Sequence, residues 1–329
     1  MRTVFVLPLL AFASGALAAD STDYKFNFVV KVGDGRPTTV SGAFPPASTH
    51  RLPATDHLVF EIETPTGKEE WPVTSVKLID DTSGTPMVRT MQRDNRPASQ
   101  ERSTTYTVCG DRVIALSPGP PTPASCSGLL PMAKPDPVLG GCNDCLGPYE
   151  GMPKKIASRS RIAPAGAPGE PLVLTGRVLG PDGKPRPQII VYAYHTNAEG
   201  IYPPPDPPRS TASNHHGQLR AWAKTDAKGR YVFETIRPGG YPSGREPQHI
   251  HMHVIEPGCA TYFIDELLFS DDPRLTAELR ERISRGFGGK AIVTPMRDAA
   301  GTWHVVRDIH LGENIPGYTG CPAPSATQS

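Results

Sequence analysis

The frequency with which proline and glycine interrupt this chain most constrains its fold. The sequence has 329 residues, of which 38 are proline and 32 are glycine. Between these breaks lie short runs in which apolar and polar residues alternate, for example residues 25–30 and 58–62. Alternation of period two is typical of β-strands, and frequent prolines prevent long helices. The pattern predicts an all-β protein with long loops and one short helix, at residues 273–285, where Asp272 can cap the first turn.

The alternating runs fall into two groups, which predict two β-domains. We assign residues 19–116 to a small antiparallel β-domain in which nothing indicates chemistry. Residues 142–322 form the second domain, which we expect to be a β-sandwich. Between them, residues 117–141 are rich in proline and predict a stiff, extended linker. Residues 323–329 are predicted to be a tail.

The first residues have the pattern of a secretory signal peptide, residues 1–18. Arg2 precedes the apolar run 4–12, and Ala16 and Ala18 form a small-residue cleavage site. The apolar run is shorter than the ~20 residues that span a bilayer as a helix, so we expect no membrane insertion. The mature protein is therefore predicted to be secreted or periplasmic.

The charge balance excludes one class of partner. The chain has 34 basic and 33 acidic residues, a formal net charge of +1 at pH 7. A protein that binds nucleic acid mainly through phosphates needs a basic excess, because binding is driven by counterion release. We therefore expect no nucleic-acid partner and no attraction to an anionic membrane surface.

Six cysteines, an even number, suit the oxidising conditions that an exported protein meets. The sequence alone does not choose among their pairings, although proximity suggests Cys109 with Cys126 and leaves Cys142 and Cys145 as a tight loop. A redox-active or zinc-binding Cys-x-x-Cys is the alternative for the second pair. Because no second pair with zinc-finger spacing exists, a structural disulfide is the better interpretation.

The densest chemical signal is a run of alternating histidines, His249, His251 and His253. Side chains alternate along a strand, so all three are expected on one face, where they can share a metal ion. Three of the ten histidines lie within these five positions, which favours a metal site over an ordinary polar strand face. The pattern does not identify the metal.

Several short motifs occur in a fixed order between residues 147 and 273. They are residues 174–178, 182–183, 191–202, 225–231, 236–242 and 249–251. This ordered set resembles the intradiol ring-cleavage dioxygenases, which include catechol 1,2-dioxygenases and protocatechuate 3,4-dioxygenases. The resemblance implies an intradiol-dioxygenase-like β-sandwich for the second domain, and the segment before Cys142 has no counterpart in it.

The resemblance also implies a non-haem iron(III) cofactor. In the family, two tyrosines and two histidines hold the ion, and the matching residues here are Tyr202, Tyr241, His249 and His251. Phenolates are hard anionic donors that favour iron(III). Because the ordinary pKa of tyrosine is near 10, only a strongly charged ion keeps two phenols ionised at neutral pH.

By the same resemblance, the protein is an enzyme of aromatic compound catabolism. It would insert both atoms of dioxygen into a small catechol-type substrate, cleaving the ring between the two hydroxylated carbons to give a muconate-type product. Tyr241 would leave the iron when substrate binds and take a substrate proton, as both ligand and catalytic base. We assign substrate binding to Arg220, Trp222 and Glu266.

Two positions depart from the family pattern. Glu246 lies three residues before His249, where the family commonly has a charge-stabilising arginine, and the adjacent Arg245 is the candidate for that catalytic role. Glu266 replaces a glutamine that is often found on the following strand. A carboxylate at either place repels an anionic substrate, so the sequence supports iron binding better than turnover.

Two other functions are compatible with the sequence. A noncatalytic transthyretin-like or carboxypeptidase-regulatory-like binding module has similar strands and turns, but does not need Tyr202 or the histidine pair. A different metalloenzyme would hold iron(II), copper or zinc through His249, His251 and a carboxylate such as Glu266. Metal analysis and oxidation state separate these alternatives. An oligomer is compatible with each of them.

Overall fold

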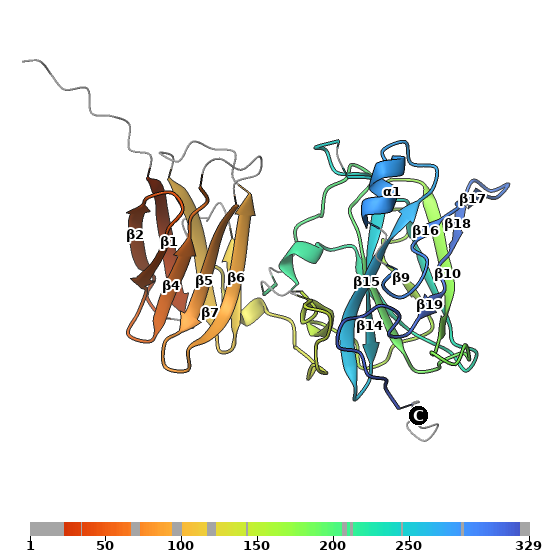
Figure 1. Cartoon of the computed structure of the whole chain (residues 1–329), viewed down its shortest axis with the longest axis horizontal. Helices are drawn as coiled ribbons and strands as arrows, with labels where there is room; N and C mark the ends of the chain where they lie inside the picture. The colour runs from red at the N-terminus through yellow and green to blue at the C-terminus, as the bar shows by residue number, and fades with distance from the viewer. Residues whose placement is uncertain are drawn as a thin grey trace, which may run out of the picture. The chain divides into compact units, whose positions relative to one another are not determined.

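The computed structural model describes residues 23–33, 35–66, 73–93, 101–116, 123–142, 144–205, 209–210, 213–244, 246–283 and 286–322. Within these residues the chain is nearly all β, with one α-helix and short 3-10 helices (Figure 1). The predicted all-β fold class is therefore confirmed. The predicted signal peptide and tail, residues 1–18 and 323–329, lie outside the described residues.

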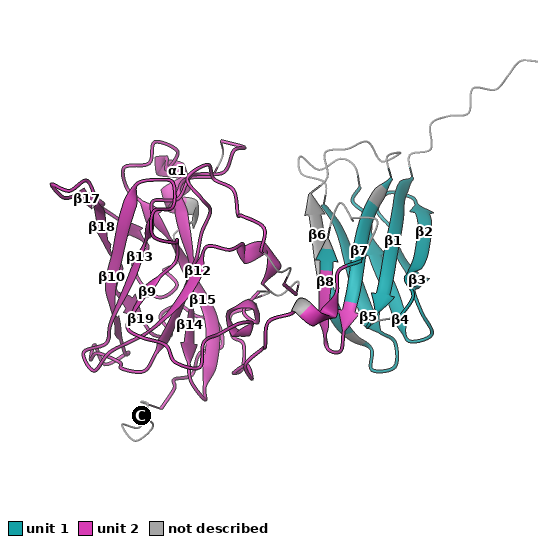
Figure 2. Ribbon diagram, turned by 180° about the vertical axis from the view of Figure 1, so that it is seen from behind, with its two compact units in different colours: residues 1–107, 115–123 teal, residues 108–114, 124–329 magenta. Residues whose placement is uncertain are grey.

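The chain divides into two compact units (Figure 2). Unit 1 comprises residues 1–107 and 115–123, and unit 2 comprises residues 108–114 and 124–329. The strands before residue 117 are β1 (Tyr24–Val32), β2 (Thr38–Phe44), β3 (Thr49–Pro53), β4 (Leu58–Glu63), β5 (Val73–Asp80), β6 (Thr85–Arg93), β7 (Arg102–Cys109) and β8 (Arg112–Leu116). They form two sheets, in the orders β2-β1-β7-β8 and β3-β4-β5-β6.

The core of unit 1 follows from the alternation in its strands. In β1 and β4 the buried positions alternate with partly exposed ones, and Phe28 and Phe60 are almost fully buried. The rings of these two residues lie 4.4 Å apart, and Tyr106 packs against both. The pairs β1–β2, β3–β4, β4–β5 and β5–β6 are antiparallel, which confirms the predicted small antiparallel β-domain.

Unit 2 contains the remaining strands. These are β9 (Arg159–Arg161), β10 (Pro171–Leu179), β11 (Ile190–Tyr194), β12 (Arg220–Lys224), β13 (Arg230–Ile236), β14 (His249–Glu256), β15 (Ala260–Phe269), β16 (Ile292–Val293), β17 (Met296–Arg297), β18 (Trp303–Val306) and β19 (Ile309–His310). One sheet has the order β17-β18-β10-β13-β9, with β19 paired to β10, and the other has the order β12-β11-β14-β15-β16. One buried apolar cluster takes Leu174 and Phe233 from the first sheet and Ala193 and Met252 from the second, as expected for a β-sandwich.

The helix of unit 2 is shorter than predicted. It is α1 (Ala277–Ile283), so it begins at Ala277 rather than at residue 273. Asp272 does not cap it, because its carboxylate accepts hydrogen bonds from the backbone N–H groups of Gln248 and Arg274 at 2.6 and 2.9 Å. Thr276 caps the helix instead, through a 3.2 Å bond from the N–H of Leu279 to its hydroxyl.

All six cysteines form disulfides. The pairs are Cys109–Cys126, Cys142–Cys145 and Cys259–Cys321. The first two confirm the pairs that proximity along the chain suggested. The third closes a separation of 62 residues within unit 2. Long closures of this kind restrict the unfolded chain most strongly, in the chain-entropy account of disulfide stabilisation.

Part of the segment predicted as a linker is paired within unit 2. Met132 forms a β-bridge with Glu150, and Val138 forms one with Thr261. The N–H of Leu139 also donates to the carbonyl of Thr261 at 2.9 Å. A proline-rich segment cannot pair its backbone groups within a helix of its own, because proline has no N–H donor. Pairing with unit 2 satisfies these groups instead and gives the segment a fixed path.

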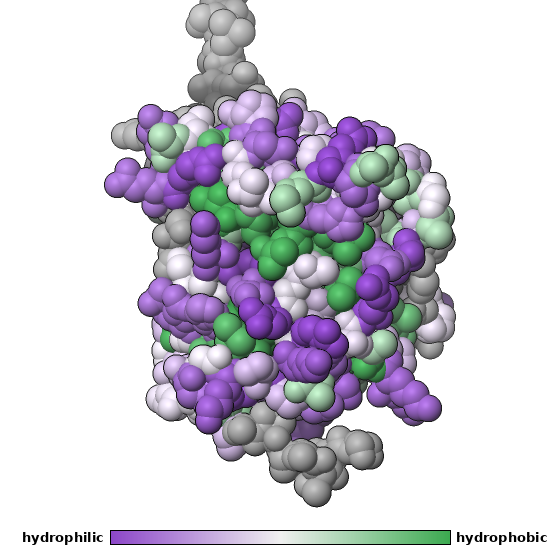
Figure 3. Space-filling model, turned by 90° about the vertical axis from the view of Figure 1, so that its right-hand side faces the viewer, coloured by the Kyte–Doolittle hydropathy of each residue, from purple (hydrophilic) through white to green (hydrophobic). Residues whose placement is uncertain are grey.

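The described surface is mostly polar. In the view of Figure 3, apolar side chains gather in a patch that polar side chains surround. Met296 and Val306, on β17 and β18, are among the exposed large apolar residues. No helix in the described part of the chain is long and apolar enough to cross a membrane.

Replacing Glu256 with glutamine is expected to stabilise the protein at neutral pH. Glu256 is buried and accepts hydrogen bonds from the hydroxyls of Tyr262 and Tyr318, at 2.7 and 3.3 Å. Burial raises the pKa of Glu256, and the two hydroxyls offset this only in part. Protonated Glu256 therefore contributes to stability below the pKa that this residue has in the unfolded chain. The contribution is lost as the pH rises through the higher pKa that Glu256 has in the folded chain.

Urea unfolding between pH 4 and 8 tests this expectation. The Glu256→Gln variant should lose less stability than the original chain as the pH rises. Glu199→Gln, at an exposed position, is the matched control and should follow the original chain. Parallel pH profiles for the original chain and Glu256→Gln would contradict the expectation.

Candidate metal centre

The outer face of one sheet carries most of the predicted site residues. In β11, β12 and β14, alternate side chains point into the sandwich core, among them Ala193, Ala221 and Met252. The residues between them point to the opposite face. Tyr194 is directly opposite His251 across the β11–β14 pair, and Tyr192 is opposite His253. The alternation of the three histidines therefore places them on one face, as predicted, and leaves the core apolar.

Four polar side chains meet at this face. The hydroxyls of Tyr202 and Tyr241 lie 3.0 Å apart. The Nε2 atom of His249 lies 3.3 Å from the hydroxyl of Tyr241 and 3.2 Å from Nε2 of His251. Both histidines come from β14, whereas the tyrosines come from the loops that follow β11 and β13. The structure thus brings together the four residues that the sequence predicts as metal ligands.

Close backbone packing holds the two tyrosine loops together. The N–H of Gly239 donates to the carbonyl of Asn197 at 2.8 Å, and the hydroxyl of Thr196 donates to the carbonyl of Gly239, also at 2.8 Å. A Cβ atom on Gly200, which has φ = +79°, would clash with the carbonyl of Gly240. Glycine is required at residue 200 for both reasons, and this close approach sets the distance between the two tyrosines.

Local contacts orient the two histidines. Nδ1 of His249 lies 2.8 Å from the carbonyl of Pro247, so Nδ1 carries the proton and the Nε2 lone pair faces the other donors. The ring of His251 stacks on that of Tyr194, with centroids 4.6 Å apart. The β14–β15 register shifts between Ile250 and Met252, and Glu266 reaches the Nδ1 side of His251, at 3.7 Å.

The electrostatics of the four donors fit a highly charged metal ion. Burial raises the pKa of Tyr202 well above its usual value, and the neighbouring Tyr241 raises it further. Burial also raises the pKa of Tyr241. The carboxylates of Glu246 and Glu266 raise this pKa too, because their negative charge opposes ionisation of the phenol. Burial lowers the pKa of His251, which is therefore neutral and able to bind metal. Two phenols with raised pKa values ionise only beside a strong positive charge.

The spacing of the donors also fits a metal ion. Metal–nitrogen and metal–oxygen bonds of about 2.0–2.2 Å place neighbouring ligand atoms roughly 3–3.5 Å apart. Three neighbouring pairs of donor atoms, Tyr202–Tyr241, His249–His251 and Tyr241–His249, are separated by 3.0, 3.2 and 3.3 Å. Two phenol oxygens and two imidazole nitrogens form a hard donor set that suits iron(III).

His253 does not join this group. Its Nε2 lies 3.4 Å from Oδ1 of Asp144, on a separate loop. The prediction that the three histidines can share one metal ion is therefore wrong for His253. Sequence spacing places a side chain on a face, but the loop that covers that face decides its partner.

The predicted substrate-binding residues make different contacts. Arg220 is buried, and its guanidinium donates to the carbonyls of Gly147 and Glu150 at 3.2 and 2.6 Å. The indole N–H of Trp222 donates to the carbonyl of Pro148 at 2.7 Å. Both side chains thus tie residues 147–150 to the sheet. Their substrate contacts stay a prediction.

The structure describes Glu246 and Glu266, the two positions that depart from the family pattern, but not the adjacent Arg245. Glu266 is half-buried beside His251, whereas Glu246 is exposed on the loop before β14. Arg245, the predicted catalytic arginine, lies outside the described residues. Its role therefore stays a prediction.

Three further residues at this face, Tyr194, Asp144 and Glu150, were not predicted from the sequence. Tyr194 lies between the rings of His251 and His216, at 4.6 and 3.9 Å. Asp144 lies near three histidines, and Glu150 holds the loop that carries two of them. The alternation of Tyr192 and Tyr194 along β11 could have predicted that Tyr194 lies on this face. The roles of Asp144 and Glu150 could not be predicted in this way, because their partners are distant in sequence.

Part of the chain is similar to known dioxygenases. Residues 154–287 match a family model described as a dioxygenase. The protocatechuate 3,4-dioxygenase beta chain of Burkholderia cepacia is 37% identical over 120 residues, which cover 32% of this chain and 48% of the relative. Catechol 1,2-dioxygenase 1 of Acinetobacter lwoffii is 37% identical over 100 residues, which cover 29% and 31%. The chain thus spans about half or less of these relatives.

A solved structure was also similar. The dioxygenase domain of a dioxygenase and carbohydrate-binding protein fusion from Streptomyces sp. SirexAA-E is 24% identical, with a TM-score of 0.37, and the match covers 58% of this chain and 98% of that one. The matched residues include all four convergent donors, Tyr202, Tyr241, His249 and His251. By the family model and the curated relatives, residues 154–287 of this chain are similar to the intradiol ring-cleavage dioxygenases.

Proposed function

We propose that this protein is an exported iron(III) dioxygenase that cleaves a catechol-type ring between its two hydroxylated carbons. The observation that carries the proposal is the convergence of two phenol and two imidazole donors, each within 3.0–3.3 Å of at least one other. A muconate-type dicarboxylic acid is the expected product. Bound iron(III) would supply Lewis acidity toward the two diol oxygens and the electron transfer needed for reaction with dioxygen.

The two tyrosines have different backbone surroundings, which supports different roles. Tyr202 is followed directly by Pro203 and Pro204, which restrict its backbone, and its ring packs 6.0 Å from that of Tyr194. Tyr241 begins a turn of exposed residues, closed by a 2.9 Å bond from the N–H of Gly244 to its carbonyl. We assign the permanent ligand role to Tyr202. With iron bound, the phenolate oxygen of Tyr241 would leave the ion when substrate binds and take a proton from a diol hydroxyl.

The geometry argues against the rival metalloenzyme. A site made of His249, His251 and Glu266 needs the carboxylate near the Nε2 atoms that face each other. Glu266 instead lies beside Nδ1 of His251, on the other side of the ring. The noncatalytic binding module is the remaining rival, and it gives no reason for the four donors to converge.

Iron content and visible absorption of the purified chain test the proposal. We expect bound iron and a red tyrosinate-to-iron(III) band that shifts when catechol is added without oxygen. Tyr241→Phe should change this band, because it removes one phenolate, whereas Tyr318→Phe, the matched control, should not. A colourless protein that stays free of iron after iron supplementation would overturn the proposal and favour the binding module.

The two acidic residues near Tyr241 lead us to propose a substrate without an acidic ring substituent. Glu266 and Glu246 both act on Tyr241, and a carboxylated diol would add a further negative charge. We expect catechol to exceed 3,4-dihydroxybenzoate in kcat/KM by more than about 10-fold, or roughly 1.4 kcal/mol. Glu266→Gln should narrow this ratio, and Glu313→Gln, at an exposed site, should leave it unchanged. A ratio near one for the original chain would contradict this substrate class.

Export is part of the proposal. The pattern of residues 1–18 supports it, as does the pairing of all six cysteines in disulfides, which persist in oxidising compartments. The amino terminus of protein recovered from its natural source tests it. We expect a first residue at Ala19, and a retained amino terminus would contradict export by cleavage.

A further inference from the structure

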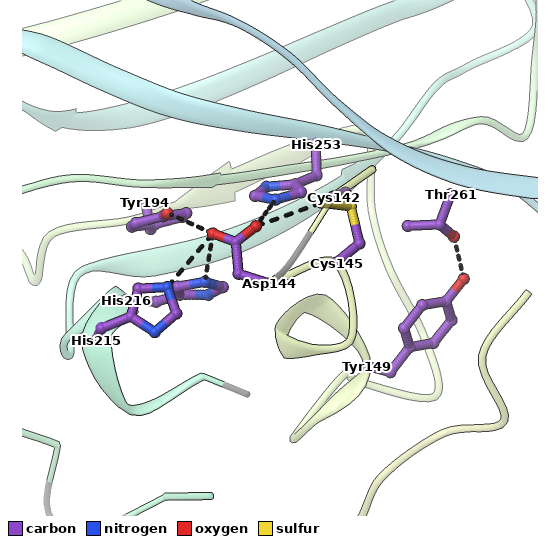
Figure 4. The surroundings of a disulfide bond; sticks show 9 residues. All are labelled: Cys142, Asp144, Cys145, Tyr149, Tyr194, His215, His216, His253 and Thr261. Carbon is purple, nitrogen blue, oxygen red and sulfur yellow. Dashed lines mark hydrogen bonds and ion pairs between the residues drawn. A yellow bond between two sulfur atoms is a disulfide. The ribbon is translucent and has the colours of Figure 1, made fainter. Parts of the chain in front are cut away.

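A second group of histidine and aspartate side chains, residue types that can bind metal ions, lies on the same face as the four donors. Asp144 is at its centre, in the loop that the Cys142–Cys145 disulfide closes (Figure 4). His215 and His216 come from the 3-10 helix Asn214–His216, in the loop after Tyr202. Oδ2 of Asp144 lies 3.3 Å from Nε2 of His215 and 3.6 Å from Nε2 of His216. None of these residues belongs to the proposed iron site.

Hydrogen bonding does not account for His216. Its side chain is fully buried, and Nδ1 lies 2.7 Å from the hydroxyl of Tyr192. The Nε2 atom is buried without a hydrogen-bond partner and faces Asp144 at 3.6 Å, which is too long for a hydrogen bond. Buried polar atoms in folded proteins are nearly always paired. A metal ion bound by both the unpaired imidazole nitrogen and the carboxylate that faces it would give the nitrogen a partner.

The distances support the same conclusion. The ligand atoms of Asp144, His215 and His216 all lie within 4.8 Å of one another. In a tetrahedral zinc site with bonds of about 2.0–2.2 Å, ligand atoms are roughly 3.3–3.6 Å apart. The measured separations of 3.3 and 3.6 Å from Asp144 fall in this range. They are longer than the 2.7–2.9 Å of charge-assisted hydrogen bonds.

We propose that Asp144, His215 and His216 form a second metal site that binds one divalent transition-metal ion of the zinc type. Oδ2 of Asp144 and the Nε2 atoms of the two histidines are the ligands. Two imidazoles and a carboxylate are a common ligand set for zinc, and three protein ligands leave one position for water.

Neighbouring groups orient these ligands. Nε2 of His253 lies 3.4 Å from the other carboxylate oxygen, Oδ1, and Tyr192 fixes the ring of His216. Such outer-shell bonds are typical of metal sites. Burial opposes the ionisation of Asp144, but the nearby imidazoles of His215, His216 and His253 lower its pKa far below the usual range. Burial keeps His216 neutral by lowering its pKa.

The nearby sulfur atoms are not ligands of this site. Sγ of Cys142 lies 3.3 Å from Oδ1 of Asp144, but Cys142 and Cys145 are joined in a disulfide. A disulfide sulfur lacks the thiolate charge that binds zinc. The oxidised pair instead closes a short loop, which restricts the backbone on both sides of Asp144. The site is therefore built from nitrogen and oxygen ligands only.

A stacked ring connects this site to the iron site. Tyr194 lies between His216, with centroids 3.9 Å apart and planes at 14°, and His251, at 4.6 Å and 15°. Its hydroxyl also donates to Oδ2 of Asp144 at 3.3 Å. A zinc ion that fixes His216 and Asp144 would therefore fix Tyr194 as well. The site does not depend on the proposed iron chemistry.

Zinc binding to the full chain tests the proposal without measuring activity. The chain is stripped with a chelator and titrated with Zn²⁺ by calorimetry, in a His249→Ala background that removes one donor of the iron site. We expect one Zn²⁺ per chain. Adding His215→Ala or Asp144→Asn should weaken zinc binding more than about 10-fold. Adding His310→Ala, an exposed histidine bonded to Glu313, should leave it unchanged.

Two results would overturn the proposal. One is the absence of a stoichiometric zinc site in the His249→Ala chain. The other is equal zinc affinity in the His215→Ala and His310→Ala chains. His215 is exposed, so its replacement keeps the test valid even where Asp144→Asn disturbs folding. Substituting Co²⁺ gives a second readout, because the visible band of a tetrahedral nitrogen and oxygen site should disappear with His215→Ala.

Discussion

Replacing His249 with alanine is expected to abolish iron binding and ring cleavage while leaving unit 2 folded. Nε2 of His249 lies between two other donors, at 3.3 Å from the Tyr241 hydroxyl and 3.2 Å from Nε2 of His251. Its own orientation is fixed by the carbonyl of Pro247. Changes in outer-shell partners alone cost about 10–100-fold in metal affinity or activity, and we expect loss of a ligand to exceed this range.

Iron analysis and initial rates with catechol measure this effect. His304→Ala is the matched control, because His304 is an exposed histidine that also has a close partner, Asp298 at 2.8 Å. The control should retain iron and rate. Thermal unfolding of the His249→Ala chain, measured without metal, should be close to that of the metal-free original chain. Full iron content and rate in the His249→Ala chain would rule out the four-donor centre.

The second large effect is expected for Glu150→Ala, which should destabilise unit 2 by about 3–5 kcal/mol. Glu150 is fully buried. Its carboxylate accepts hydrogen bonds from the N–H and hydroxyl of Ser210, at 3.1 and 2.5 Å, and from the hydroxyl of Ser213, at 2.6 Å. Arg112 lies 3.5 Å away. Alanine leaves three hydrogen-bond donors of Ser210 and Ser213 without their acceptor and removes the carboxylate beside the Arg112 guanidinium.

Scanning calorimetry should show the transition of unit 2 about 6–20 °C lower, at roughly 2–4 °C for each kcal/mol. Glu234→Ala is the matched control. Glu234 pairs with Arg159 at 2.7 Å on the surface, where such pairs contribute less than about 1 kcal/mol. Glu150→Gln keeps the shape and two acceptor sites, so its loss should be intermediate. Equal transitions for Glu150→Ala and Glu234→Ala would contradict the anchoring role of Glu150.

The strands and the common face of the three histidines follow closely from the sequence, whereas Tyr202 and Tyr241 were predicted only through the family resemblance. Period-two patterning reports which side of a strand is buried, and in β14 the buried Ile250, Met252 and Val254 alternate with the three histidines. The pairing of Cys109 with Cys126 follows from proximity in the same way. These features depend on neighbours in sequence, so a single sequence is enough to predict them.

The features that the sequence does not reveal depend on loops that return from far away. Asp144 meets His215 across 71 residues and His253 across 109 residues. Arg220 was expected beside substrate, but its described bonds go to residues 147 and 150, which precede it by 73 and 70 residues. No local pattern encodes such contacts, because they are fixed only when the loops fold over the sheet.

The separation of the two faces of β14 has a consequence for how such a protein changes over generations. Substitutions at His249, His251 and His253 alter the chemistry, whereas substitutions at Ile250, Met252 and Val254 alter the core. A descendant can therefore lose or exchange the proposed metal without losing its architecture. The fold is inherited through one set of positions and the reactivity through the other, and the two can diverge at independent rates.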